Sequence, residues 1–254
     1  MSPLQTLRGL LTLLLAPILT FFVSLFALID MLWVRRSEWK AQQFPRWWGK
    51  SICRLAKVRV RMEGLENIDP KQTYIFAGNH ASQFDIFAFQ GYFPYDFRWI
   101  AKKELFRLPV FGQAMQQVGY IAIDRSQGRQ AMKSLDDAAA KIAAGKSVLI
   151  FPEGTRSSDG RLKEFKTGAI LLAIKAGVPI VPVGFNGSHL VLPKGKILTN
   201  SGEIVLRIGS PIATQGFKAK DKQQLAIDLH QAVAGLLHES QLPNPDHKDV
   251  KTEE

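Results

Sequence analysis

The residues from Gly9 to Ile29, GLLTLLLAPILTFFVSLFALI, form a run of 21 without a charged side chain. A helix that crosses a bilayer needs about 20 mostly apolar residues, so this run is long enough to span one. Pro17 lies inside it and lacks the N–H that a helix interior uses, so a kink or break is expected there. The run therefore predicts a single kinked span, or a re-entrant or interfacial helical hairpin broken near Pro17. A signal peptide is a third alternative, but no clean small-x-small cleavage site follows.

Positive charge is distributed unevenly around this run. Only Arg8 precedes it, and the basic residues that follow are Arg35, Arg36, Lys40, Arg46 and Lys50. Because basic segments stay on the cytoplasmic side of a membrane, everything after Arg36 is predicted to be cytoplasmic. The aromatic residues among these charges are Trp39, Phe44, Trp47 and Trp48. This mixture suits lipid headgroups and predicts a helical membrane-binding motif over residues 1–56; a soluble helix covering a domain edge is the alternative.

The overall charge narrows the class of partner. The chain carries 33 Lys and Arg against 22 Asp and Glu, a formal net charge of +11. Such a surplus favours an anionic partner, whether nucleic acid, anionic lipid headgroups or a phosphorylated substrate. Cys53 is the only cysteine, which excludes an intramolecular disulfide and a multi-cysteine metal site. Its apolar and basic neighbours predict a packed, unreactive thiol.

From residue 57 onward, short β-rich runs alternate with segments of helical periodicity. The predicted strands cover residues 57–62, 73–78, 98–101, 120–123, 147–151, 179–185 and 203–209, and the predicted helices cover residues 82–92, 103–117, 130–144, 166–177 and a segment from 221. This alternation predicts an α/β domain over residues 57–238, with a mixed, largely parallel sheet flanked by helices. Residues 239–254 are polar and contain proline, so a disordered tail is expected there.

The first candidate site, NHASQFD at 79–85, follows a predicted buried strand, where catalytic groups gather in α/β sheets. Its spacing lets His80 and Asp85 meet only if His80 lies in the turn before a helix and Asp85 in the first turn. With Ser82 as N-cap, Asp85 takes the third helical position. It could then accept a hydrogen bond from one imidazole nitrogen and leave the other as a base. A capping aspartate near a structural loop histidine gives the same pattern.

Other strand ends carry charged residues. The segment FPEGTRS at 151–157 follows the run SVLIF, and Gly154 permits a tight turn in it. Arg156 in this segment offers the forked donor that suits phosphate. Arg125 follows the strand YIAI, and Lys102 follows RWIA, so both are further candidate phosphate ligands. Each cation taken singly is an ordinary surface group, but together at neighbouring strand ends they would form an anion pocket.

These blocks together resemble a known family. The ordered set NHASQFD (79–85), GYIAIDR (119–125), FPEGTRS (151–157) and IVPV (180–183) is similar to the four motif blocks of the glycerolipid acyltransferases. Within that family the chain most resembles the 1-acyl-sn-glycerol-3-phosphate acyltransferases, the lysophosphatidic acid acyltransferases of PlsC type. One short block is weak evidence, whereas four blocks in this order are specific.

The resemblance implies direct acyl transfer from acyl-CoA or acyl-ACP to the sn-2 hydroxyl of lysophosphatidic acid, giving phosphatidic acid without an acyl-enzyme. His80 would act as general base and Asp85 would orient it. The residues implied in holding the glycerol phosphate are Glu153, Gly154, Thr155 and Arg156, with Arg125 and Lys102 as further ligands. A backbone N–H near Gly154 is expected to serve the oxyanion. No cofactor and no metal are expected, and the active site is expected at the cytoplasmic membrane face.

Several rival functions share parts of this pattern. An acyltransferase for another acceptor, such as a lysophospholipid or a lyso-aminolipid, stays open because its motifs would look alike. A serine hydrolase would need a G-x-S-x-G elbow, which the sequence lacks. A nucleic-acid-binding module fits the charge but neither the apolar run nor the missing binding motif. A non-catalytic scaffold of this fold would be indicated by loss of His80 or Asp85, and both are present.

Overall fold

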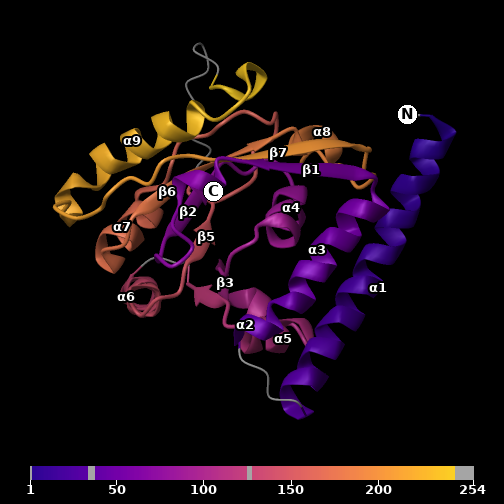
Figure 1. Ribbon diagram of the computed structural model, residues 1–254, viewed down its shortest axis with the longest axis horizontal. Coiled ribbons are helices and arrows are strands. Elements are labelled where there is room, and N and C mark those ends of the chain that lie inside the picture. The colour runs from indigo at the N-terminus through magenta and orange to yellow at the C-terminus, as the bar shows by residue number, and fades with distance from the viewer. Residues whose placement is uncertain (1, 34–37, 125–127, 244–254) are drawn as a thin grey trace.

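The computed structural model of the chain describes residues 2–33, 38–124 and 128–243 (Figure 1). Within these residues, one sheet of seven strands has the order β1-β7-β6-β2-β5-β3-β4. Its strands are β1 (Val58–Glu63), β2 (Ile75–Gly78), β3 (Arg98–Lys102), β4 (Ile121–Ile123), β5 (Val148–Ile150), β6 (Ile180–Asn186) and β7 (Gly202–Ile208).

The strand directions decide where the motif segments meet. β2, β5, β3 and β4 are neighbours and run parallel, and β6 runs parallel to β2 on its other side. β7 is antiparallel to β6, and β1 is parallel to β7 at the sheet edge. The predicted mixed, largely parallel sheet is therefore confirmed. Parallel strands present their carboxyl ends at one edge, so the segments after β2, β5, β3 and β4 come together there.

Helices cover both faces of this sheet (Figure 1). The α-helices are α1 (Pro3–Trp33), α2 (Glu38–Ala41), α3 (Gln43–Leu55), α4 (Phe84–Tyr92), α5 (Phe111–Gln117), α6 (Arg129–Ala143), α7 (Thr167–Ala176), α8 (Ser188–Val191) and α9 (Lys222–Ala234), and the 3-10 turns are η1 (Leu65–Asn67), η2 (Lys103–Arg107), η3 (Ala219–Asp221) and η4 (Glu239–Gln241). The helix predicted over 103–117 is divided, as Pro109 suggested, into η2 and α5.

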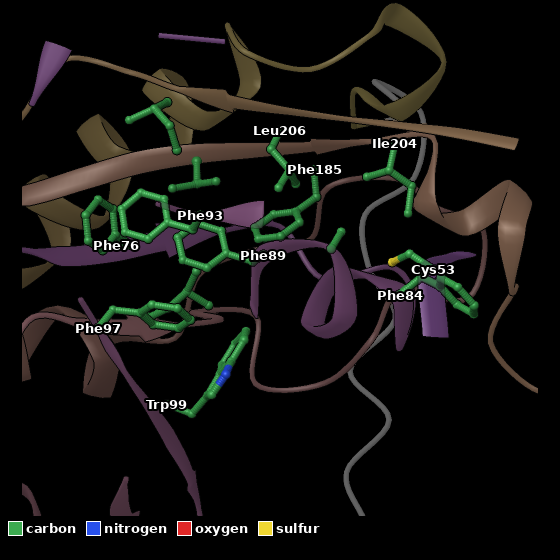
Figure 2. Close-up of a cluster of buried hydrophobic side chains, with 14 of the residues drawn as sticks. Cys53, Phe76, Phe84, Phe89, Phe93, Phe97, Trp99, Phe185, Ile204 and Leu206 are labelled. Atoms are coloured by element: carbon green, nitrogen blue, oxygen red, sulfur yellow. The ribbon is translucent and has the colours of Figure 1, made fainter. Parts of the chain in front are cut away.

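Alternation along β2 divides the core between the two faces. Phe76 packs with α3 and α4 on one face, whereas Ile75 and Ala77 pack with α6, α7 and α9 on the other. The first face holds a cluster of aromatic rings, drawn in Figure 2. Cys53 is buried in that cluster, and burial raises the pKa of its thiol to about 12. The predicted packed thiol is thus found, and it is held in the unreactive protonated form.

α1 is one continuous helix of 31 residues that includes Pro17, so the break expected near that residue does not occur. It packs against α3 and α5, and the Trp48 indole N–H donates to Thr20 Oγ1 at 2.9 Å. Its outward side exposes Leu4, Leu7, Leu10, Leu11, Leu14, Ile18, Phe21, Phe22, Phe26 and Ile29 among others. By length and composition α1 could cross a membrane, and the exposed row of apolar side chains suits contact with lipid.

The ordered structure continues beyond the predicted domain end at residue 238. η4 follows directly, and Gln241 within it is buried. Its amide donates to the Phe185 carbonyl at 3.0 Å and accepts from the Gly187 N–H at 3.2 Å. The first residues of the predicted disordered tail are therefore fixed to the end of β6. The rest of that tail, residues 244–254, lies outside the described residues.

Candidate active site

The predicted site residues gather at the carboxyl edge of the parallel strands. His80 follows β2, the 151–157 segment follows β5, and Lys102 ends β3. Strand β5 lies between β2 and β3, so these three groups come from neighbouring strands. Arg125, predicted as a phosphate ligand after β4, lies outside the described residues.

His80 and Asp85 form a close pair. His80 Nδ1 lies 2.8 Å from Asp85 Oδ2, and the same oxygen accepts the backbone N–H groups of Ala81 and Ser82 at 2.9 Å each. Because a carboxylate only accepts, Nδ1 carries the proton and Nε2 is left as the basic nitrogen. Asp85 is fully buried, whereas the His80 side chain keeps 14% of its surface exposed. The pair therefore presents a base to the solvent side and an orienting carboxylate behind it.

The local geometry differs from the prediction by one helical position. α4 begins at Phe84, so Asp85 is its second residue rather than its third. The N-cap residue is Gln83 rather than Ser82, although the Ser82 Oγ accepts the Phe84 N–H at 3.1 Å. The first turn is tight, with the Asp85 N–H bonded to the Ser82 carbonyl three residues earlier. This turn before the helix brings His80 back over Asp85, as the spacing required.

The 151–157 segment makes three contacts with His80. Glu153 Oε1 accepts the His80 backbone N–H at 3.0 Å, and the Ser157 N–H donates to the His80 carbonyl at 2.8 Å. The Phe151 ring stacks on the imidazole with centroids 3.9 Å apart and an angle of 8° between the planes. Such ring pairs contribute about 0.5–1.5 kcal/mol beyond burial. The second motif therefore positions the base supplied by the first.

Glu153 is 2% exposed and is not among the residues that line the pocket, so its role in holding the substrate stays a prediction. Burial raises the pKa of Glu153 to about 8, Asp85 raises it further, and the His80 N–H and Lys163 lower it. Oε2 makes no hydrogen bond to the residues that the structure describes. At neutral pH the side chain is thus mostly the neutral acid. Its described hydrogen bond is to the His80 backbone.

A pocket of about 560 Å³ opens in front of His80. Most of its lining is apolar and includes Val23 and Ala27 of α1, Phe87 of α4, and Phe111 and Met115 of α5. Its polar lining includes His80, Lys102, Gly154, Thr155 and Arg156. One cavity therefore joins a base and two cations to an apolar lining that reaches the long N-terminal helix.

The cations at the polar lining differ in their partners. Lys102 and Arg156 form no ion pair with the acidic residues of the described ranges, whereas Lys103 pairs with Asp124 at 2.6 Å. Lys194 Nζ donates to the Arg156 carbonyl at 2.9 Å and fixes that turn. The turn depends on Gly154, whose φ of +75° lies in the left-handed region. Lys102 and Arg156 are thus available to an anion at the pocket wall.

The amide expected to stabilise an oxyanion is not that of Gly154. Its N–H donates to the Phe151 carbonyl at 3.0 Å and closes the turn. The next two amides, of Thr155 and Arg156, make no hydrogen bond within the described ranges. Any oxyanion donor in this turn would therefore be one of these two.

Three supports of the site have no signal in the motif spacing. Asn79 joins β2 to β6 by two hydrogen bonds with the Phe185 backbone, at 3.0 and 2.7 Å. Gln90 of α4 accepts both the Trp99 indole N–H at 2.7 Å and the Tyr120 hydroxyl at 2.9 Å. Burial raises the pKa of Tyr120, which keeps that hydroxyl a donor. The Asn79 contacts join two strands far apart in sequence, and the Gln90 contacts join α4 to β3 and to the residue before β4.

A family model described as Acyltransferase matches residues 59–186, half of the chain, and spans all four motif blocks. The chain belongs to the acyltransferase family. Among its relatives, the 1-acyl-sn-glycerol-3-phosphate acyltransferase of Cocos nucifera is 36% identical over 185 residues, covering 72% of this chain and 59% of the relative. The one from Pseudomonas aeruginosa is 32% identical over 209 residues, covering 82% of this chain and 76% of the relative.

A solved structure agrees with this membership of the acyltransferase family. The 1-acyl-sn-glycerophosphate acyltransferase PlsC from Thermotoga maritima superimposes with a TM-score of 0.76 at 27% identity, covering 93% of this chain and 98% of that one. The predicted resemblance to the 1-acyl-sn-glycerol-3-phosphate acyltransferases is thus confirmed. The match spans 59%, 45% and 44% of the length of three plant relatives, from Cocos nucifera, Brassica napus and Arabidopsis thaliana.

Proposed function

We propose that the chain transfers an acyl group from acyl-CoA or acyl-ACP to the sn-2 hydroxyl of lysophosphatidic acid, forming phosphatidic acid. The observation that carries the proposal is the His80–Asp85 pair, 2.8 Å apart, in the wall of a pocket that also presents Lys102 and Arg156. A base and two cations in one cavity match an acceptor that bears both a hydroxyl and a phosphate. The names of several relatives support the same acceptor.

In the proposed reaction, His80 Nε2 takes the proton of the acceptor hydroxyl while its oxygen attacks the thioester carbonyl. Asp85 accepts the Nδ1–H and stabilises the imidazolium that forms. The tetrahedral intermediate collapses, the C–S bond breaks, and the leaving thiolate takes the proton from the imidazolium. The base returns to its starting state without an acyl-enzyme. The amides of Thr155 and Arg156 are the oxyanion donors that we propose.

Glu153 takes the part of a positioning residue in this proposal. Its carboxyl group anchors the His80 backbone at 3.0 Å, and its raised pKa keeps it mostly protonated at neutral pH. Two neighbouring buried carboxylates would each disfavour ionisation of the other. A neutral Glu153 therefore adds no second negative charge beside the Asp85 side chain.

The proposed binding mode follows from the polar and apolar linings of the pocket. Lys102 and Arg156 would hold the acceptor phosphate, with Arg125 as a further ligand, and the apolar lining would surround an acyl chain. α1 would associate with the membrane, and the basic residues after it would keep the active site at the cytoplasmic face. The acceptor is a membrane lipid, so this placement brings the hydroxyl to the base.

The test is acyl transfer by the full chain in detergent, with lysophosphatidic acid compared against lysophosphatidylcholine and a lyso-aminolipid, and acyl-CoA against acyl-ACP. We expect lysophosphatidic acid to be the best acceptor. Lys102→Met and Arg156→Met should each raise the KM for it roughly tenfold, because one charge-assisted phosphate contact is lost. Lys222→Met, on α9, is the matched control and should leave KM unchanged. Equal use of the lyso-aminolipid, which has no phosphate, would contradict the phosphate pocket.

A further inference from the structure

The segment 188–199, which contains α8 and the loop after it, carries two strongly exposed aliphatic side chains. Leu190 is 66% exposed and Ile197 is 67% exposed. Two exposed lysines, Lys194 and Lys196, lie between them in the sequence. Aliphatic side chains flanked by lysines on a surface loop match the chemistry of an anionic lipid interface, where the former enter the acyl boundary and the latter contact headgroups.

The segment is held in shape rather than free. The Asn200 side chain donates to the Leu190 carbonyl at 2.9 Å, and the Asn200 N–H donates to the Val191 carbonyl at 2.8 Å. These bonds close the base of the loop. Exposure of Leu190 and Ile197 is therefore maintained by specific contacts, and large exposed apolar groups held in this way mark interaction surfaces.

The segment also lies against the apolar N-terminal helix. A Cβ added at Gly9 of α1 would lie 3.1 Å from the Thr199 carbonyl oxygen and 3.4 Å from Leu198 Cβ, so the two backbones approach closely there. Figure 1 shows α8 and its loop at the end of the molecule where α1 begins. The exposed aliphatic pair is thus adjacent to the helix whose outward side carries the exposed leucines.

We propose that the 188–199 segment is a second membrane-contact element, which seats Leu190 and Ile197 in a phospholipid surface bearing anionic headgroups. The proposal rests on the membrane association proposed for α1. Contact with the apolar helix α1 and the positive charge of the segment favour lipid over a protein partner. Lys194 connects this contact to the active site, because its ammonium group holds the Arg156 carbonyl at 2.9 Å. Membrane contact would therefore set the cation for the acceptor phosphate near the depth of lipid headgroups.

An environment-sensitive fluorophore tests the contact directly. Leu190→Cys is compared in the full chain with Met132→Cys on α6, which is 45% exposed on the other face of the sheet. Cys53 is buried, so labelling is confined to the introduced thiol. When vesicles of phosphatidylcholine and phosphatidylglycerol are added, we expect the emission of the fluorophore at position 190 to shift to the blue. The emission at position 132 should not shift. An equal shift in emission at the two positions would overturn the proposal, whether or not the chain transfers acyl groups.

The rate of acyl transfer provides a second test of the membrane contact. Leu190→Ser/Ile197→Ser should lower transfer to lysophosphatidic acid in vesicles roughly tenfold, because two aliphatic groups no longer enter the interface, with no change on a dispersed short-chain acceptor. Met132→Ser/Ile227→Ser, which replaces two exposed apolar residues on α6 and α9, is the matched control and should match wild type on both acceptors. An equal loss on both acceptors would assign the segment to the fold. A loss confined to acyl-ACP as donor would assign it to a protein partner.

Discussion

The Glu153 carboxyl group accepts the backbone N–H of His80 at 3.0 Å from beneath the pocket, so it touches the base and not the cavity. Glu153→Gln keeps an acceptor oxygen in place, whereas Glu153→Ala leaves a buried donor unpaired at a cost of about 1–3 kcal/mol. We expect Glu153→Gln to retain kcat within about threefold, and Glu153→Ala to lose roughly ten- to a hundredfold in kcat, with the KM for the acceptor unchanged in both. Steady-state kinetics measures kcat and the KM for the acceptor separately. A raised KM with little change in kcat would support the predicted role in substrate binding.

The raised pKa of Glu153 also predicts how stability depends on pH. Below about pH 4.5 the folded and unfolded chains both hold the proton, so burial carries no ionisation penalty. Between its ordinary value of 4.5 and about 8 only the folded chain holds it, so the free energy of unfolding falls as pH rises. Glu153→Gln lacks this loss, so its melting temperature relative to wild type should increase between about pH 4 and about pH 9. Glu164→Gln, at an exposed neighbour, should show no such trend.

Asp85 orients the imidazole through an oxygen that also accepts two backbone N–H groups. In Asp85→Asn an amide replaces one oxygen and removes the buried charge that stabilises the imidazolium. We expect kcat to fall roughly 10²- to 10⁴-fold while the KM for the acceptor changes little. Asp137→Asn, an exposed carboxylate on α6, is the control. A near-normal kcat in Asp85→Asn would contradict the orienting role and leave Asp85 only a structural role at the start of the helix.

Phe151 stacks on the His80 ring and packs against Trp99 and Phe185. Phe151→Leu keeps most of the apolar volume but removes the flat surface that fixes the imidazole plane. We expect kcat to fall roughly five- to tenfold, in line with the 0.5–1.5 kcal/mol of such a ring contact. Phe165→Leu, whose ring contacts His230 away from the pocket, should keep kcat. If the two variants behaved alike, the stacking would have no role in positioning the base.

The fold was predictable from the sequence because its central strands β2, β5 and β6 are buried on both faces. Runs such as SVLIF end abruptly in Gly, Pro or charge, and parallel strands place those ends together, so the positions of His80, Lys102 and Arg156 followed from pattern alone. The continuity of α1 did not follow. Pro17 removes one backbone hydrogen bond, but packing of α1 along α3 and α5 holds the helix together across it.

The burial of Glu153 was beyond the sequence for a different reason. A glutamate in a strand-end turn is usually exposed, and no local pattern shows that this one lies under the pocket with 2% of its surface accessible. The one-residue error at Asp85 has a similar origin, since the Ser82 hydroxyl before α4 donates to the Leu192 carbonyl, which is remote in sequence. Gln241 was assigned to a polar tail because its partners, Phe185 and Gly187, are remote in sequence.

The central claim is that His80 is the base for acyl transfer, and His80→Ala tests it most directly. With acyl-CoA and lysophosphatidic acid in detergent, we expect kcat to fall roughly 10²- to 10⁴-fold, while the melting temperature and the affinity for lysophosphatidic acid stay near those of wild type. His230→Ala, outside the pocket, should retain kcat. Transfer by folded His80→Ala at a rate near that of wild type would contradict the account.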